Sequence, residues 1–341
     1  MKKVMIVANS THGGGAENAM RSLGEILAKQ GFSTTFVALN DMDDGISVSN
    51  ENVVFIGRKW SEGFLRTKIH LGNFRRVVKT HKPDLIIANC ELPELFTAFV
   101  SLGNSKLIIV EHTSKPWEGR RFLGYLVRVI LFAKRSNWVT VNSSQSKIWP
   151  LNQSATFIPN TVVSVKKDGQ EFIGRDIVFV GRLRKEKCPE LLIQACQEAA
   201  IPLRLFGEGN QGYDLKARYG NPEMTKFMGY LENPWFFVSP ESLVVVPSEY
   251  EGDGLVVLEA IQNGNAVLLR DNIDLRRFNL SNEHYFKDGP DLTEKLLFFK
   301  KNLTSFKVSG IVRDRLLDER SATNIGKKWS SFIENSIESL R

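Results

Sequence analysis

The sequence predicts an α/β protein built from two open parallel sheets, each covered by helices. Short apolar runs rich in Val and Ile recur along the chain and alternate with segments of helical character, which is the pattern of parallel α/β sheets. The alternation is interrupted once, around residues 159–175, where the composition is typical of a loop. A chain of 341 residues is long enough for two domains.

The candidate strands of the first half follow in a regular order. Residues 2–9 (KKVMIVAN) form the first, and a glycine-rich loop at 13–17 (GGGAE) then opens a helical pattern that runs to about residue 30. Further apolar runs, separated by helical or loop segments, occupy residues 33–40, 52–58, 84–90, 106–112 and 137–143.

The alternation restarts after the interrupting loop. The candidate strands of the second half are residues 176–182, 202–209, 226–230, 242–248 and 265–271. A helical spacing of apolar residues ends the chain, at Trp329, Phe332, Ile333, Ile337 and Leu340. We therefore predict domains at 1–165 and 166–322, a linker within 160–175, and a C-terminal helix at 323–341 that packs back toward the first domain. Two such domains imply a cleft between them, with ligands beyond the carboxyl ends of the strands.

Composition excludes several classes of protein. Apolar residues make up 42% and charged residues 24% of the chain, as in soluble globular proteins. The three cysteines form no CxxC pair, which favours a reduced, cytoplasmic compartment. No stretch approaches the roughly 20 apolar residues that a membrane-spanning helix needs.

The net charge of +7 is unevenly distributed. Residues 1–165 contain 20 Lys and Arg against 12 Asp and Glu, whereas the rest of the chain contains 25 against 26. The first half is therefore expected to face something anionic, which could be nucleic acid, a membrane surface or a phosphorylated substrate.

Two stretches that follow predicted strands could bind phosphate. At 13–17, glycine N–H groups and a helix N-terminus would face an anion, although an ordinary βα turn has the same composition. Position 18 is Asn and no GxGxxG spacing follows, so a dehydrogenase is disfavoured. After the strand at 176–182, Arg182 and Lys187 supply two cations that suit a diphosphate. A solvated charged turn is the alternative there.

The most informative stretch is PSEYEGDGLVVLEA at residues 247–260. It follows a predicted strand, so EYEGDG forms the loop at the carboxyl end and LVVLEAIQN a helix that ends at Gly264. The helix N-terminus would offer free N–H groups at 252–255 to a diphosphate. Glu251 and Glu259 flank this point, and eight helical positions span at most about 12 Å. That length is near the separation of the two sugar rings of a nucleotide sugar, so Glu251 is expected to hold hydroxyls of the transferred sugar and Glu259 the ribose diol.

In chain order, IPNTV, GRLRKEKCPELLI, FGEGN, FMGY and PSEYEGDGLVVLEAIQNGNAV resemble motifs of the family-4 retaining glycosyltransferases of GT-B fold. Together these motifs, from about residue 158 to 270, are specific for that superfamily. The resemblance implies two Rossmann-like domains facing across a cleft, and transfer of a sugar from a nucleoside-diphosphate sugar, UDP-sugar by default, with retention at the anomeric carbon. It also implies a lipid-linked saccharide acceptor in surface polysaccharide or glycoconjugate synthesis, with diacylglycerol as an alternative acceptor.

The same resemblance assigns roles to single residues. It implies that Glu251, His112, Arg182 and Lys187 are catalytic, His112 being the histidine at the end of the strand LIIVEH. The implied donor-binding residues are Gly15, Arg182, Lys187, Phe227, Gly229, Tyr230, Glu251, Gly252, Asp253, Gly254, Leu255 and Glu259, with 227–230 near the nucleobase. Two positions depart from the family pattern. Asp253 stands where an aromatic residue is usual, and Thr113 follows His112 where a small or acidic residue is more frequent.

The predicted chemistry needs neither a metal nor a cofactor. Arg182, Lys187 and the helix N-terminus can stabilise the charge that develops on the leaving diphosphate, and the chain has no HExxH or CxxC motif to bind a metal. The resemblance implies a front-face mechanism, in which the departing phosphate helps to deprotonate the acceptor hydroxyl. Two alternatives are a sugar-nucleotide epimerase of the same fold and a non-catalytic, membrane-docked partner subunit. Nucleic acid is not an expected partner, because no recognised binding motif is present.

Two segments of the first half combine basic and apolar residues. Residues 58–82 hold eight Lys and Arg with one acid, and residues 115–135 hold six with one. Interleaved with them are Trp60, Phe64, Leu65, Trp117, Phe122, Leu123 and Tyr125. Such mixtures suit an anionic membrane surface, where each cation contributes about 1 kcal/mol. We therefore expect a cytoplasmic protein that associates peripherally with the inner face of the cytoplasmic membrane. A solvated charged face beside a packing helix is the alternative.

Overall fold

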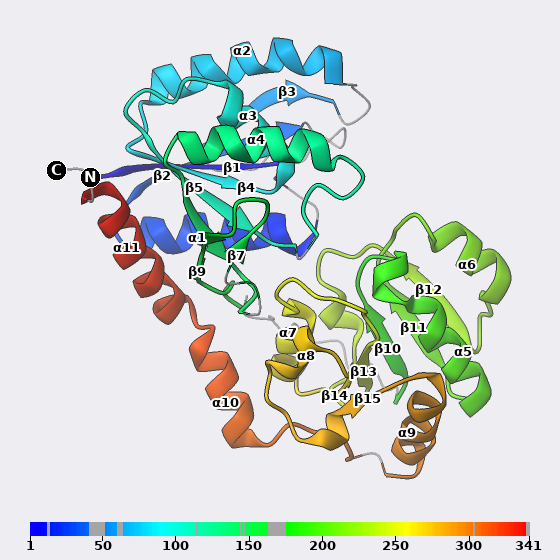
Figure 1. Ribbon diagram of the computed structural model, residues 1–341. Coiled ribbons are helices and arrows are strands. Elements are labelled where there is room, and N and C mark those ends of the chain that lie inside the picture. The colour runs from blue at the N-terminus through cyan, green and yellow to red at the C-terminus, as the bar shows by residue number, and fades with distance from the viewer. Residues whose placement is uncertain are drawn as a thin grey trace. The chain divides into compact units, whose positions relative to one another are not determined.

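A computed structural model of the chain (Figure 1) describes residues 1–11, 14–40, 52–59, 64–113, 115–143, 145, 147–162, 175–302 and 304–338. The chain divides into two compact units, a first unit of Met1–Thr161 with Arg320–Arg341 and a second unit of Val162–Glu319. Several predictions lie outside the described residues: Gly13, Trp60, Leu340, most of the linker at 160–175, and the side chains of Phe64 and Leu65.

The first unit is built on a parallel sheet. Its strands are β1 (Lys3–Ala8), β2 (Ser33–Asn40), β3 (Val53–Arg58), β4 (Leu85–Asn89), β5 (Lys106–Glu111), β6 (Asn137–Thr140) and β9 (Thr156–Phe157). They lie in the order β3-β2-β1-β4-β5-β6-β9, and every neighbouring pair is parallel. Each strand predicted in this half is present. The short strand β9 and the antiparallel ribbon of β7 (Lys147–Ile148) and β8 (Gln153–Ser154) were not predicted.

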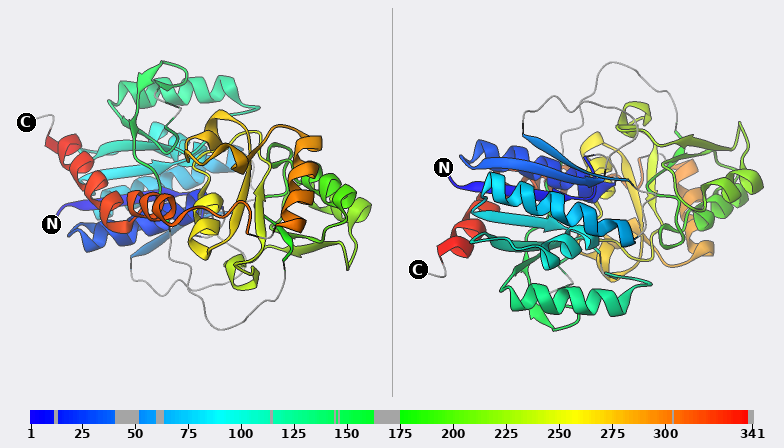
Figure 2. Two further views of the ribbon diagram at one scale, coloured as in Figure 1. Left: turned by 90° about the horizontal axis from the view of Figure 1, so that it is seen from below. Right: turned by 90° about the horizontal axis from the view of Figure 1, so that it is seen from above.

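Helices cover both faces of this sheet (Figure 2). On one face lie α1 (Gly15–Lys29) and α11 (Ala322–Glu338), and on the other α2 (Phe64–His81), α3 (Glu91–Phe99) and α4 (Arg121–Ala133). Successive side chains of a strand point to opposite faces, so in β1 Val4 and Ile6 join the core under α1 and α11, whereas Met5 and Val7 join the other core. Both faces are therefore buried, which explains why the strands are continuous apolar runs.

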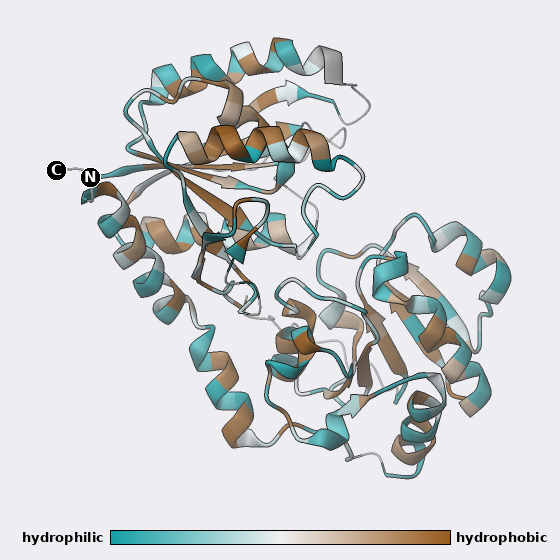
Figure 3. Ribbon diagram, viewed as in Figure 1, coloured by the Kyte–Doolittle hydropathy of each residue, from teal (hydrophilic) through white to brown (hydrophobic). Residues whose placement is uncertain are grey.

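The second unit repeats this architecture. Its strands are β10 (Ile177–Val180), β11 (Leu203–Phe206), β12 (Thr225–Gly229), β13 (Leu243–Val246), β14 (Ala266–Arg270) and β15 (Tyr285–Phe286), parallel and in the order β12-β11-β10-β13-β14-β15. Its helices are η1 (Lys185–Lys187), α5 (Pro189–Ala199), α6 (Gly212–Tyr219), η2 (Pro234–Phe237), α7 (Leu255–Asn263), α8 (Ile273–Arg276), η3 (Asn282–His284), α9 (Gly289–Lys301) and α10 (Gly310–Glu319). Figure 3 shows its central strands as hydrophobic, and only the short β15 was missed by prediction.

Both sheets have the doubly wound strand order, which positions ligand sites within each unit. The chain direction along the sheet reverses between β1 and β4 in the first unit, and between β10 and β13 in the second. Ligands of such sheets bind outside the carboxyl ends of the strands at this reversal. In the second unit those ends lead into residues 181–187 and 247–254, which hold the predicted diphosphate-binding and sugar-binding residues.

Candidate functional site

The loops after β10 and β11 lie in direct backbone contact. A Cβ atom on Gly207 would lie 2.0 Å from the carbonyl oxygen of Gly181, and Gly207 also has a φ of +128°, which favours glycine. The Gly181 N–H donates to the Phe206 carbonyl at 2.9 Å. This contact fixes the loop that carries Arg182, whose side chain is exposed.

The central feature of the second unit is an ion pair between Lys187 and Glu251. Lys187, at the end of η1, places its Nζ 2.6 Å from Glu251 Oε1. The Ser248 hydroxyl donates to the same oxygen at 2.7 Å, and the Glu251 N–H donates to Asp274 Oδ2 at 3.0 Å. The Glu251 side chain is 8% exposed and that of Lys187 24%. Two residues predicted to bind different parts of a donor therefore lie in contact, with the lysine open to solvent.

The N-terminus of α7 is shaped by Gly254. This residue caps the helix in the left-handed conformation, with a φ of 63°, and a Cβ there would lie 3.1 Å from the Phe278 ring. Arg277 Nη1 donates to the Gly252 carbonyl at 2.7 Å and so fixes the turn before the cap. Asp253 is buried. The predicted helix limits are confirmed, since α7 begins directly after this turn and ends before Gly264.

Glu259 lies inside α7 and contacts Trp235. The Trp235 Nε1–H donates to Glu259 Oε2 at 3.1 Å. Burial raises the pKa of Glu259, and the hydrogen bond from Trp235 opposes that shift. The carboxyl group is therefore partly desolvated and held by a buried ring. This environment suits it to form hydrogen bonds with hydroxyl groups.

The strand β12 and the residue after it supply an aromatic edge. Phe227 packs partly buried against the core on the α5 side, and Tyr230 is 53% exposed. The Gly229 carbonyl accepts a hydrogen bond from the Gly207 N–H at 2.7 Å, which ties this segment to the loop after β11. The Tyr230 N–H donates to Glu208 Oε1 at 3.4 Å.

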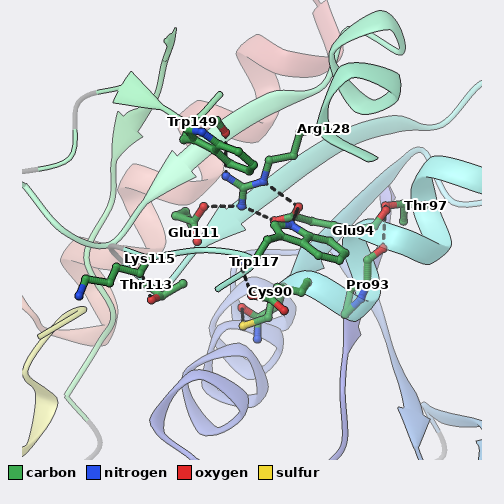
Figure 4. Close-up of polar contacts among 12 residues, drawn as sticks. Cys90, Pro93, Glu94, Thr97, Glu111, Thr113, Lys115, Trp117, Arg128 and Trp149 are labelled. Carbon is green, nitrogen blue, oxygen red and sulfur yellow. Dashed lines mark hydrogen bonds and ion pairs between the residues drawn. The ribbon is translucent and has the colours of Figure 1, made fainter. Parts of the chain in front are cut away.

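The remaining predicted residues lie in the first unit. Gly15 is the first residue of α1 and is exposed. His112 directly follows β5 and is half-buried. Figure 4 shows the polar contacts near the end of this strand, where Arg128 on α4 donates to both Glu111 and Glu94, the latter on α3.

Sequence reasoning did not identify three residues that hold the predicted acids. Ser248 stood in the quoted stretch at 247–260, and its place three positions before Glu251 could have signalled the contact. Asp274 and Trp235 carry no such signal, because they reach α7 and its preceding loop only through the tertiary fold.

The described part of the chain lacks two features that other proteins use for metal binding or membrane crossing. Within those residues, no group of three His, Cys, Asp or Glu side chains lies close enough together to hold a metal ion. Among the helices that the structure describes, none combines the length and the apolarity that crossing a membrane requires.

Two family models match this chain. The one described as Glycosyltransferase Family 4 matches residues 13–149, and the one described as Glycosyl transferases group 1 matches residues 166–296. An uncharacterized glycosyltransferase of Haemophilus influenzae is 25% identical in an alignment of 285 residues that covers 77% of this chain and 79% of that protein.

Solved structures share the fold at low sequence identity. Sucrose-phosphate synthase from Thermosynechococcus elongatus has a TM-score of 0.80 and 17% identity, over 99% of this chain and 100% of that one. HepE from Anabaena, in complex with UDP and glucose, has a TM-score of 0.79 and 15% identity, over 98% and 100%. The two sheets of this chain therefore have the architecture of these enzymes.

Proposed function

This chain belongs to the family-4 glycosyltransferases and has the GT-B fold, and from that premise we propose that it is a retaining enzyme that uses a nucleoside-diphosphate sugar. The donor is UDP-sugar and the acceptor a lipid-linked saccharide. The second unit, expected over 166–322, binds the donor, and the first, expected over 1–165, binds the acceptor. The UDP and glucose held by the related HepE structure support this choice of donor class.

The observation that carries the proposal is the contact between Lys187 and Glu251. The two opposite charges neutralise each other at 2.6 Å. A donor diphosphate attracts the lysine, which is the more exposed partner, and so releases Glu251 to accept hydrogen bonds from sugar hydroxyls. The N-terminus of α7 and Arg182 stabilise the negative charge that develops on the leaving diphosphate, and the reaction needs no metal ion.

Other predicted residues bind the remaining parts of the donor. Glu259, held by Trp235 within α7, accepts the ribose diol. Phe227 and the exposed Tyr230 flank the nucleobase. In the first unit, His112 contacts the transferred sugar or the acceptor hydroxyl, and Gly15 brings the N-terminus of α1 close to the bound substrates.

A donor screen tests this function. The purified protein is incubated with UDP-, GDP- and dTDP-sugars and a lipid-linked saccharide, and the anomeric configuration of the product is read by NMR. We expect transfer from a UDP-sugar with retention and no loss of activity in EDTA. Inversion, or loss on chelation that Mg²⁺ restores, would contradict the proposed mechanism. Glu251→Gln should lower this transfer, and Glu249→Gln is its matched control, because Glu249 is two residues away and its side chain is 55% exposed.

The two alternatives make different predictions for the same assay. An epimerase changes the donor sugar without any acceptor, so product analysis in the absence of acceptor separates it from a transferase. A non-catalytic partner subunit gives no product under any condition. The Lys187–Glu251 contact favours the transferase, because a decayed site has no need to keep a paired acid and base.

The outer face of α4 supports docking on a membrane. Figure 3 shows this helix as hydrophobic along most of its length, and its outward side exposes Phe122 (79%), Tyr125 (46%), Leu126 (43%) and Phe132 (48%). Exposed arginines precede this face, at positions 120 and 121. The prediction that Trp117 belongs to this surface is wrong, since Trp117 is only 2% exposed and belongs to the core. A face that is apolar with a basic border suits an anionic lipid surface.

The helix α2 adds positive charge to the same layer of the first unit. Its side chains at Lys68, Arg75, Arg76 and Lys79 are exposed and recur at helical spacing. We therefore propose that the first unit docks peripherally on the inner face of the cytoplasmic membrane, where a lipid-linked acceptor is presented. Diacylglycerol is the alternative acceptor at that surface.

Vesicle co-sedimentation tests the docking. Binding should need anionic lipid, fall steeply with salt, and weaken when Arg75, Arg76, Arg120 and Arg121 become Ser or when Phe122 and Leu126 become Ser. The control replaces Lys216 and Lys301, two exposed lysines of the second unit, by Ser. Equal binding to neutral vesicles, or none to anionic ones, would refute the docking and leave the transferase assignment intact.

A further inference from the structure

The segment between β5 and α4 begins with His112 and is anchored by a buried tryptophan. Trp117 is 2% exposed and has a φ of 57°, in the left-handed region that non-glycine residues rarely occupy. A Cβ on Gly124 of α4 would lie 2.3 Å from Trp117 Cγ, so only glycine at 124 leaves room for the ring. The strained backbone and the fitted ring indicate that the chain at Trp117 is held in one conformation.

Two carboxylates of α3 hold this tryptophan. Its backbone N–H donates to Glu91 Oε1 at 2.5 Å, and its ring Nε1–H donates to Glu94 Oε2 at 2.8 Å. Figure 4 shows the indole lying beside the carboxylate of Glu94. Both the main chain and the side chain of Trp117 are therefore fixed by α3.

The other end of the segment is held by Glu111, the residue before His112. Its main-chain carbonyl accepts a hydrogen bond from the Val141 N–H at 3.3 Å, which ties this end of β5 to the residue after β6. Arg128 Nη2 lies 2.5 Å from Glu111 Oε2 and 2.7 Å from Glu94 Oε1. One guanidinium thus joins Glu111, directly before His112, to the acid that holds Trp117.

We propose that Trp117, Glu94, Arg128 and Glu111 are positioning residues for His112, which they serve by fixing the main chain on both of its sides. This inference rests on the proposed function, in which His112 contacts the sugar or the acceptor. The four residues lie inside the first unit and act on the substrate only through the histidine and its backbone.

A purely stabilising role accounts less well for this cluster. Two carboxylates and a guanidinium, each no more than 4% exposed, lose their hydration on burial, and an apolar replacement of the same volume is often as stable or more stable. What a charged cluster adds is direction, because its hydrogen bonds are strong and geometrically specific. Here those bonds hold Glu111, directly before His112, and Trp117, five residues after it.

The experiment compares Trp117→Phe with Trp138→Phe. Both tryptophans are buried in the same core, at 2% and 4% exposure. Arg128 lies over the Trp138 ring at 5.2 Å, yet among the described residues Trp138 Nε1 has no hydrogen-bond partner. The two substitutions remove the same atoms from the same core, and only Trp117→Phe removes a hydrogen bond to Glu94. Glu111→Gln is the second variant, because it keeps the size of the side chain and removes the ionisable carboxyl group that pairs with Arg128.

Two readouts are measured on the full-length protein. The first is the ring resonance of His112 in protein labelled with ¹³C-histidine, assigned by its loss in His112→Ala. The second is steady-state transfer, together with the affinity for UDP. We expect the His112 resonance to move and kcat to fall by about tenfold or more in Trp117→Phe and Glu111→Gln. Trp138→Phe should change neither, and the affinity for UDP should stay within about twofold in all three.

The outcomes separate positioning from general loosening. An unmoved His112 resonance in Trp117→Phe and Glu111→Gln would overturn the inference, and so would equal changes in Trp138→Phe. Unaltered kcat in His112→Ala would overturn it as well, because no reaction would then depend on the histidine. If the wild-type protein transfers sugar from no donor, the proposed function fails, whereas the resonances still report whether the cluster positions His112.

Discussion

The pH dependence of stability should change when Glu111 is replaced by Gln. Glu94 and Glu111 share the single guanidinium of Arg128, and all three side chains are buried. One negative charge is uncompensated when both acids are ionised. The pKa of Glu111 is raised to about 7 in all, because burial raises it, Arg128 opposes the shift and the charge of Glu94 adds to it.

The sign of the effect follows from proton linkage. The folded protein keeps a proton on Glu111 up to about pH 7, whereas an unfolded glutamic acid loses it near its ordinary value of 4.5. Within this interval the folded state binds more protons, so the stability that this proton provides is complete below the unfolded pKa and is lost as pH rises to about 7. An interval from 4.5 to about 7 corresponds to roughly 3 kcal/mol of unfolding free energy.

Urea unfolding of the wild-type protein and Glu111→Gln at several pH values between about 4.5 and 8 measures this effect. The unfolding free energy of the variant minus that of the wild type should rise by roughly 3 kcal/mol from the acid end to about pH 7. The reason is that the wild type loses stability as Glu111 ionises, whereas Gln cannot ionise. Glu241→Gln, which alters an acid with 64% side-chain exposure, should give a constant difference. A constant difference for Glu111→Gln would refute the reasoning about the shared guanidinium.

Further substitutions test the second unit. Glu251→Ala and Arg182→Ala should each lower transfer by at least about a hundredfold, equivalent to roughly 3 kcal/mol. Calorimetry with free UDP should show weakened binding only for Arg182→Ala, whereas competition between donor sugars should lose discrimination only for Glu251→Ala. Near-normal turnover in both would contradict the site. Gly207→Ala should destabilise the protein by at least about 2 kcal/mol, because its methyl group would collide with a carbonyl oxygen. Gly310→Ala, which meets no atom within 4 Å, should unfold like the wild type in urea, and equal stability of both variants would contradict the contact.

The fold was predictable because its strands are buried on both faces. The central strands β1, β4, β5, β10, β13 and β14 are nearly continuous apolar runs, and such runs mark strands without any knowledge of their partners. The short strands were not predicted, because they lack such a run. β7, β8 and β9 have two residues each and gain their pairing from the fold around them, so no local pattern announces them.

The candidate site was predictable only where its residues are close in sequence. The turn before α7 combines glycines and acids in one stretch, so its position and the helix limits could be inferred. The contact between Lys187 and Glu251 joins residues 64 positions apart, and no local pattern pairs them. Trp117 shows the opposite failure. An aromatic residue among basic ones suggested a surface, but Gly124, seven positions later, leaves the space that buries it.

The Lys187–Glu251 pair and the cluster of Arg128 with its two glutamates differ in what they can do, because they differ in exposure to solvent. Lys187 is 24% exposed and Glu251 8%, so a diphosphate can reach the lysine and take the place of the acid. Arg128 is 1% exposed, as is Glu94, and no ligand can compete for either without unfolding α3 or α4. The first pair can therefore exchange partners during a reaction. The second cannot, and in our proposal it acts by fixing the main chain beside His112.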